Sequence, residues 1–199
     1  MPWPKEHKRR TRSAIVESAA ALLRARGLDG AGVADIMASA GRTHGGFYAH
    51  FDSKDELLAS ALDRADDETI ETLSRAIASV PPERRIHAVI DAYLSAAHVA
   101  HPERGCPVAA LGPELTRSGG RVRRELARAI GRRTAWVRNL LTGRSRRRED
   151  AIGVLACMVG AMILARGAEP RDSEAVLAAS RRFLHRALDG GSSRLERIS

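Results

Sequence analysis

The stretch from residue 33 to residue 58 constrains the fold of this chain more than any other segment. It opens with apolar side chains at the i, i+3, i+4 and i+7 positions of one helix face: Val33, Ile36, Met37 and Ala40. Gly41 follows, and glycine often ends a helix because it adopts the left-handed backbone conformation without steric strain. These residues predict a short helix that ends in a tight turn.

A second short helix is predicted over residues 44–50, with the hydroxyl of Thr43 as its cap. Only Phe47 and Tyr48 offer apolar side chains to a core, so most of this helix stays free. It also contains two residues that each cost about 1 kcal/mol relative to alanine inside a helix: Gly45 and Gly46. Such a pair of helices is typical of a helix-turn-helix whose second helix enters the DNA major groove. The competing interpretation is a loop with glycines.

A third helix is predicted to start after Ser53, which forms a capping-box pattern with Glu56 three residues later. Lys54 lies one residue past that cap. Backbone amides at a helix start bind anions, and a positive side chain beside them strengthens the attraction. We therefore expect Lys54 to contact a DNA phosphate.

The pattern A-G-x-T-x-G-x-F-Y-x-H-F-x-S-K-x-x-L, carried by residues 40–57, resembles the N-terminal domain of TetR/AcrR-family transcriptional regulators. With the basic arm and the helices before it, the resemblance covers about 50 of the 199 residues. It implies that Thr43 and Tyr48 hold phosphates, that His50 and Lys54 flank them, and that Gly45 permits close backbone approach. His50 could equally be a packed cap on the small domain.

Base readout is expected from residues that project from the start of the second helix, namely Arg42 and His44, with Thr43 beside them. Phe47 and Phe51 are better explained as core residues than as DNA contacts. The recognition surface is therefore predicted to be small and to lie at one end of a short helix.

Residues 1–12 form a basic arm whose positive residues outnumber its single acid, Glu6: Lys5, Lys8, Arg9, Arg10 and Arg12. An arm of this kind is usually a solvated tail, but beside a helix-turn-helix it can reach the minor groove or the phosphates. Lys8, Arg9, Arg10 and Arg12 are therefore predicted DNA contacts. The first helix is expected to begin with Thr11 or Ser13 as its cap and to end at Gly27.

The net charge of +9 favours a polyanionic partner. However, the chain uses 30 arginines and only 3 lysines, a bias typical of genome composition, so position must carry the argument. Between residues 121 and 148 there are eleven arginines and one glutamate. A second DNA surface is conceivable there, but a solvated outer face is the preferred interpretation.

Composition also limits the compartment and the chemistry. Two cysteines exclude a disulfide framework and suit a reducing cytoplasm. The N-terminus carries no secretory signal pattern, and the longest uncharged run, 151–165, is shorter than the ~20 residues of a membrane span. We expect no membrane association. The chain carries no motif of an enzyme or cofactor site, and a metal site at His98, His101 and Cys106 matches no strong ligand spacing.

The rest of the chain predicts longer helices, at about 54–80, 83–101, 105–115, 121–141, 149–166 and 172–188, which makes an all-α fold of about nine helices. We divide it into a helix-turn-helix domain with a basic arm (1–53), a helical effector-binding and dimerisation domain (54–189) and a disordered tail (190–199). Candidate residues lining an effector pocket come from several of these helices: Tyr93, His98, Cys106, Trp136, Met158 and Met162. Plain core is the preferred interpretation of each; Cys106 could sense oxidants or electrophiles, but a buried inert cysteine is preferred there too.

The last two helices are predicted to form a four-helix bundle across a two-fold axis, and the resemblance implies the same dimer interface. The expected interface residues are small or apolar: Gly153, Ala156, Gly160, Val176, Phe183 and Leu184. The predicted function is a homodimeric, ligand-responsive regulator that binds a palindromic double-stranded DNA operator; the resemblance implies a repressor, and an activator is the alternative. The alternatives are a small-molecule-binding helical dimer with vestigial DNA binding, or a sequence-independent DNA-coating protein.

Overall fold

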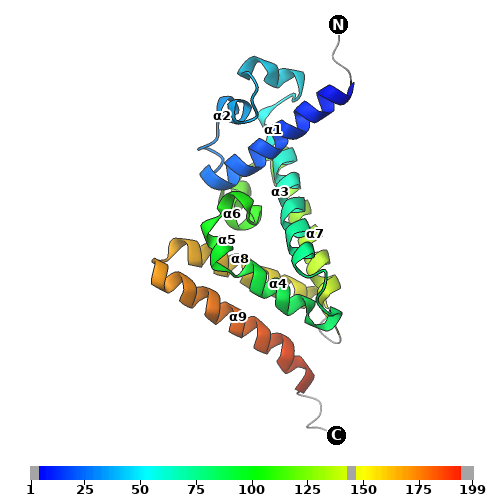
Figure 1. Cartoon of the computed structure of the whole chain (residues 1–199), viewed down its shortest axis with the longest axis vertical. Helices are drawn as coiled ribbons and strands as arrows, with labels where there is room; N and C mark the ends of the chain where they lie inside the picture. The colour runs from blue at the N-terminus through cyan, green and yellow to red at the C-terminus, as the bar shows by residue number, and fades with distance from the viewer. Residues whose placement is uncertain (1–4, 143–146, 194–199) are drawn as a thin grey trace. The chain divides into compact units, whose positions relative to one another are not determined.

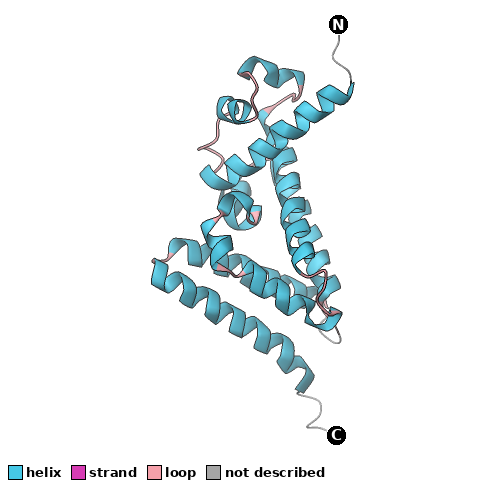
Figure 2. Ribbon diagram, viewed as in Figure 1, coloured by secondary structure: helices cyan, strands magenta, loops and turns pink. Residues whose placement is uncertain are grey.

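The computed structural model describes residues 5–142 and 147–193, and all regular secondary structure in these ranges is helical (Figures 1 and 2). The all-α prediction is therefore confirmed. Contacts divide the chain into two compact units. Unit 1 holds residues 1–69 and 102–129, and unit 2 holds residues 70–101 and 130–199. The predicted boundary at residue 53 remains a proposal about function, since the unit that contains the helix-turn-helix extends beyond it.

Unit 1 is built from the N-terminal helices together with a later segment of the chain: α1 (Lys5–Arg26), α2 (Val33–Ser39), η1 (His44–Ala49), the first part of α3 (Lys54–Ala76), η3 (Pro102–Arg104), α6 (Pro107–Arg117) and the first part of α7 (Gly120–Leu140). One hydrophobic core joins them. It includes Ile15 of α1, Ile36 of α2, Phe47 of η1, Leu57 of α3 and Leu126 of α7. The recognition segment and the start of α7 therefore share a core.

The first helix begins earlier than predicted. α1 starts at Lys5, so neither Thr11 nor Ser13 caps it, and Thr11 is buried. No proline or glycine interrupts this stretch, and Glu6 in the first turn suits the positive end of the helix dipole. The described part of the basic arm is therefore helical. Gly27, with φ of 80°, ends the helix as predicted.

Polar contacts tie α1 to the later segment within unit 1. The buried guanidinium of Arg24 donates to the carbonyl of Gly105 at 3.1 Å and to Glu68 at 2.7 Å. The backbone N–H of Leu28 donates to the Glu114 carboxylate of α6 at 2.5 Å. A buried guanidinium needs such partners because burying an unpaired charge is costly. These contacts hold α1 against α6.

Unit 2 contains the remaining helical elements: η2 (Pro82–Arg84), α4 (Arg85–Tyr93), α5 (Ala96–Ala100), α8 (Arg148–Gly167), α9 (Pro170–Ser193) and the ends of α3 and α7. α8 and α9 lie side by side (Figure 1). Tyr93, Met158 and Met162 are almost fully buried in this unit.

Two predicted helices end or break earlier than expected. The third long helix stops at Ala76 rather than at residue 80, and a turn precedes Pro81. The helix predicted over 83–101 is divided into α4 and α5, because the Ser95 hydroxyl accepts a hydrogen bond from the His98 N–H and so caps a new helix. Ser95, a residue type that often caps helices, was the feature of the sequence that could have predicted this break.

The C-terminal helix is longer than predicted. α9 continues to Ser193, past the start of the tail expected at residue 190, and residues 194–199 lie outside the described residues. Among the described helices, α8 is the one whose length and apolar composition would allow it to cross a membrane. It packs along α9 within unit 2.

Candidate nucleic-acid interface

Most of the recognition segment, residues 42–48, is exposed in unit 1. Arg42, Thr43, His44 and Gly45 are all exposed. Tyr48 is 74% exposed, which is unusual for an aromatic side chain of this size. The residues of this segment that were expected to touch DNA are therefore available to a partner.

Phe47 anchors this segment to the hydrophobic core of unit 1. Its side chain is 2% exposed, and its ring stacks on Phe51 with a centroid distance of 5.6 Å and meets Tyr48 edge-on at 5.1 Å. Phe51 is also buried, so the interpretation of both phenylalanines as core residues is confirmed. A segment with one buried anchor and exposed neighbours is held in place while its outer face remains open.

The second element differs from the prediction in its helix type. Residues 44–49 form the 3-10 helix η1, and Thr43 precedes it with no side-chain capping hydrogen bond. Two glycines in six residues weaken an α-helix, and short segments adopt the tighter 3-10 form readily. The hydroxyl of Thr43 is exposed and is not used as a cap, so it stays available to a phosphate.

The two glycines of the turn region have different roles. Gly41, with φ of 66°, lies in the left-handed region and ends α2, as predicted. At Gly45 no described atom lies within 4 Å of the place where a Cβ would stand. Packing inside the protein therefore does not demand a glycine at this position. Close approach of a partner molecule to the backbone would require a glycine there.

The start of α3 completes the surface. The Ser53 hydroxyl accepts a hydrogen bond from the Glu56 N–H at 3.2 Å, which is one half of the predicted capping box. The other half is shifted, because the Glu56 carboxylate accepts from the N–H of Asp52 at 2.8 Å rather than from Ser53. Lys54 is exposed at the first position of the helix.

The basic residues of α1 fall into two groups. Lys8, Arg9 and Arg10 are exposed, with Arg9 paired to Glu6 at 2.7 Å. Arg12, by contrast, is half-buried and held by three groups of the same unit: it donates to Glu56 and to Ser60, and its guanidinium lies 4.5 Å above the Phe51 ring. Its DNA contact remains a prediction.

Several of these positive charges act on His50. The pKa of His50 is lowered, first by burial and then by the positive charges of Lys8, Arg42 and Arg12. These three residues come from α1 and from the turn before η1. The arm and the recognition segment therefore create one positive field around a half-buried histidine, which suits a polyanion.

The six residues predicted to line an effector pocket are not brought together in one unit. Tyr93, His98, Trp136 and the two methionines belong to unit 2, while Cys106 belongs to unit 1, where it is fully buried. In unit 2 the Tyr93 and His98 rings meet edge-on at 4.5 Å, and His98 Nδ1 donates to the Tyr93 carbonyl at 2.7 Å. Burial, followed by the charges of Arg166 and Arg133, lowers the pKa of His98 to about 4, against the opposing effect of that hydrogen bond.

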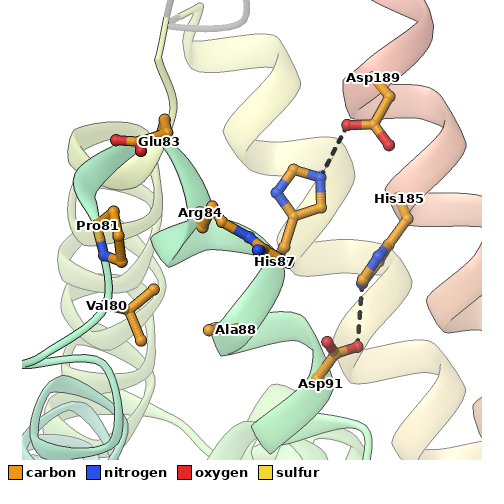
Figure 3. A pocket seen from close by; sticks show the side chains of 9 residues that line it. All are labelled: Val80, Pro81, Glu83, Arg84, His87, Ala88, Asp91, His185 and Asp189. Atoms are coloured by element: carbon orange, nitrogen blue, oxygen red, sulfur yellow. Dashed lines mark hydrogen bonds and ion pairs between the residues drawn. The ribbon is translucent and has the colours of Figure 1, made fainter.

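A cavity of about 650 Å³ opens elsewhere in unit 2, between η2, α4 and α9 (Figure 3). His87 Nε2 lies 3.1 Å from Asp189, and His185 Nε2 lies 3.0 Å from Asp91, a contact of ion-pair distance. The two imidazole rings meet edge-on at 4.9 Å. This cluster was not predicted from the sequence. The sequence feature that could have indicated it is a histidine followed four residues later by an aspartate in both helices. This spacing places the two residues on the same face of their helix.

α8 and α9 carry apolar side chains that the described residues of the chain leave exposed. Leu164 is 64% exposed and Phe183 is 58% exposed. Of the predicted interface residues, Gly153 and Ala156 are exposed, whereas Leu184 is buried among side chains of its own unit. Leu184 therefore contributes to the core of one protomer. Large exposed apolar side chains of this kind make α8 and α9 candidates for an interface.

The exposed recognition segment, the turn before it and the basic surface beside it are those of a helix-turn-helix DNA-binding protein. Comparison with known families agrees: the model of the family described as "Bacterial regulatory proteins, tetR family" matches residues 15–61, and that of the "Tetracyclin repressor-like, C-terminal domain" matches residues 82–150. The chain belongs to the tetR family of bacterial regulatory proteins.

Individual relatives are consistent with this assignment. The chain is 32% identical over 129 residues to the HTH-type transcriptional repressor DhaR of Mycobacterium sp. (strain GP1), a match that covers 64% of this chain and 62% of that protein. A TetR transcriptional regulator from Chloroflexus aurantiacus is 29% identical, with a TM-score of 0.72 over 90% of this chain and 94% of that one. A TetR-family regulator from Cytophaga hutchinsonii, 19% identical, shares the fold with a TM-score of 0.76 over 90% of this chain and 95% of that one.

Proposed function

We propose that this protein is a transcriptional repressor that binds a palindromic operator in a sequence-specific manner and releases it when a small molecule binds. The observation that carries this proposal is the recognition segment, whose polar residues are exposed while Phe47 fixes it to the core. Arg42 and His44 are the proposed base-reading residues. Thr43, Tyr48 and Lys54 are the proposed phosphate contacts, with His50 beside them and Gly45 at the closest approach.

We propose further that two copies associate through the exposed apolar face of α8 and α9. Gly153, Ala156 and Gly160 on α8 permit close helix approach, and Phe183 of α9 needs a cover. Two such helices from each copy form a four-helix bundle. To reach successive major grooves of a palindromic operator, the two recognition segments of such a dimer must lie about 34 Å apart.

The dimer is tested by sedimentation equilibrium of the unsubstituted protein and of Ala156→Arg, which places a charge at the centre of this face. We expect a dimer that dissociates on substitution. Ala127→Arg introduces the same side chain at an exposed position of α7 in unit 1 and should leave the dimer intact. A dimer that persists in Ala156→Arg would place the interface elsewhere.

The proposed effector site is the cavity between η2, α4 and α9. Its volume of about 650 Å³ lies within the range of small-molecule pockets. Its wall combines the apolar Val80, Pro81 and Ala88 with Glu83, Arg84 and the two histidine–aspartate pairs. A wall of this kind fits a small polar molecule with an apolar portion. The buried group around Tyr93 and His98 is the second candidate.

The decisive experiment is fluorescence-anisotropy binding to the DNA upstream of the protein's own gene, compared with a shuffled duplex of equal length. A preference of about 10³-fold or more is expected for a specific regulator. Equal and salt-sensitive binding to both duplexes would instead favour a sequence-independent DNA-coating protein. Failure to bind either would favour a ligand-binding dimer with vestigial DNA binding.

A further inference from the structure

The arginine-rich stretch that begins at Arg121 divides between the two compact units. Residues 120–129 belong to unit 1 together with the recognition segment, and the remainder belongs to unit 2. Val122 and Leu126 of α7 are buried in the same hydrophobic core as Phe47, Phe51 and Leu57. The first two turns of α7 are therefore held by the core that positions the recognition segment.

The outer side of these turns is positively charged. Val122 and Leu126 face the core, while Arg121 and Arg124, three residues apart, are exposed on the other side of the helix. Two neighbouring arginines are engaged locally: Arg123 donates to the carbonyl of Thr116, and Arg128 pairs with Glu125 at 3.1 Å. Within the described residues, Arg121 and Arg124 make no such hydrogen bond or ion pair.

The charge of Arg121 acts on Glu56 near the start of α3. The pKa of Glu56 is lowered, first by the hydrogen bond from the Asp52 N–H, then by Arg12, and also by the charge of Arg121. Glu56 is two residues from Lys54, a proposed phosphate contact. The first turn of α7, which shares its core with Phe47 and Leu57, therefore adds positive charge to that of Lys54 and Arg12 in the same unit.

We propose that the start of α7 forms a second DNA-backbone contact, in which Arg121 and Arg124 bind phosphates that flank the bases read by the recognition segment. The partner is the same double-stranded DNA, so this inference rests on the proposed function. Guanidinium groups suit phosphate because they donate two hydrogen bonds in a fixed geometry. Contacts of this kind add affinity and fix the protein on the duplex, and they carry no base preference.

The contrasting view is that these arginines form a solvated outer face, which the arginine-rich composition of the chain favours. The two views differ in a measurable quantity. Binding to each phosphate releases counterions, so the slope of log K against log salt concentration changes by about 0.9 for every phosphate that the protein no longer neutralises. Removal of a solvated arginine leaves that slope unchanged.

The test is an anisotropy titration of Arg121→Ala/Arg124→Ala at several salt concentrations, on the operator and on a shuffled duplex. We expect a roughly tenfold loss of affinity for both duplexes near physiological salt. The salt dependence should also weaken, with the magnitude of the negative slope reduced by up to about 1.8. Arg138→Ala is the matched control, because Arg138 is exposed on the same helix but belongs to unit 2. It should bind like the unsubstituted protein, and circular dichroism melts should show that all variants fold.

Ethylation interference supplies a second readout. Phosphates whose ethylation weakens the unsubstituted protein but not Arg121→Ala/Arg124→Ala would be the ones that α7 contacts. An unchanged affinity, slope and interference pattern in the double variant would overturn the inference while leaving the proposed function intact. An unsubstituted protein that prefers no operator sequence, yet loses affinity on this substitution, would overturn the proposed function alone. No DNA binding by the unsubstituted protein would overturn both.

Discussion

Arg12 of α1 donates a hydrogen bond to Glu56 of α3, with 2.9 Å between Nη2 and Oε1. The two residues are 44 positions apart in the sequence, and their side chains are 39% and 19% exposed. Glu56 also accepts from the N–H of Asp52, in the loop that follows η1. This pair therefore links the first helix to the loop through which the chain leaves the recognition segment, and a residue predicted as part of a loose arm is part of the fold.

We expect Arg12→Ala to lower the free energy of unfolding by about 1–2 kcal/mol, because it removes a charged hydrogen bond and the cation–π contact with Phe51. Arg9→Ala is the matched control, since Arg9 makes only an exposed pair with Glu6. Its loss should change the stability by less than about 0.5 kcal/mol. Urea denaturation of the three proteins checks both values. Equal effects of the two substitutions would show that Arg12 has no special structural role.

Gly41 and Gly45 should respond to alanine in opposite ways. Gly41→Ala forces a side chain into the left-handed region at φ of 66°, so we expect a loss of about 1 kcal/mol or more in stability. Gly45→Ala meets empty space within the protein, so the stability should stay the same or rise by up to about 1 kcal/mol. The affinity of Gly45→Ala for the operator should nevertheless fall at least tenfold, because the added methyl group blocks the approach of DNA.

Thermal or urea unfolding and anisotropy titrations of both variants separate these effects. The comparison is informative because a gain in stability combined with a loss of binding is difficult to explain by structural damage. Full operator affinity in Gly45→Ala would show that the backbone at this position does not approach DNA closely.

The sequence predicted the helix-turn-helix well because its determinants are local. The apolar spacing of α2, the left-handed glycine at 41 and the buried Phe47 each act within a few residues. The early start of α1 at Lys5 and the 3-10 form of η1 were not predicted, because helix ends and short helices depend on small differences in free energy.

Long-range relationships were beyond the reach of local patterns. Nothing near Arg12 indicates that its partner is Glu56, and nothing near His87 indicates that Asp189 lies opposite. Cys106 was grouped with Tyr93 as a candidate pocket residue, yet the two belong to different compact units. Pairings of this kind are set by how the helices pack, which a single sequence does not specify.

His98 should make the stability of the protein depend on pH. Its pKa is about 4 in the folded protein and 6.5 at its ordinary value, so below pH 6.5 the unfolded chain binds a proton that the folded protein does not. Folding free energy is therefore lost as the pH falls from about 6.5 to about 4, by up to about 3 kcal/mol. His98→Gln cannot take up this proton and should show a flatter dependence in that interval.

Urea denaturation at pH 7.5, 6.5, 5.5 and 4.5 measures the difference. His44→Gln is the control, because it makes the same substitution at an exposed histidine of η1 in the other unit. A dependence in His98→Gln equal to that of the unsubstituted protein would assign the effect to other groups.

The histidine–aspartate pairs of α4 and α9 should be required for the response to an effector and not for DNA binding. His87→Ala/His185→Ala removes both imidazoles that line the cavity, and neither residue belongs to the unit that holds the recognition segment. We therefore expect operator affinity within about twofold of that of the unsubstituted protein, provided that the dimer is retained. Release of the operator by an effector identified in a compound screen should need at least tenfold more compound.

Tyr93→Phe tests the second candidate site with little change in volume, since it removes only a buried hydroxyl. If the cavity between α4 and α9 holds the effector, Tyr93→Phe should respond to the compound as the unsubstituted protein does. A lost response in Tyr93→Phe together with a normal response in the double histidine variant would move the effector to the buried group around Tyr93 and His98. The two variants therefore decide between an effector bound beside α9 and one bound in the core of unit 2.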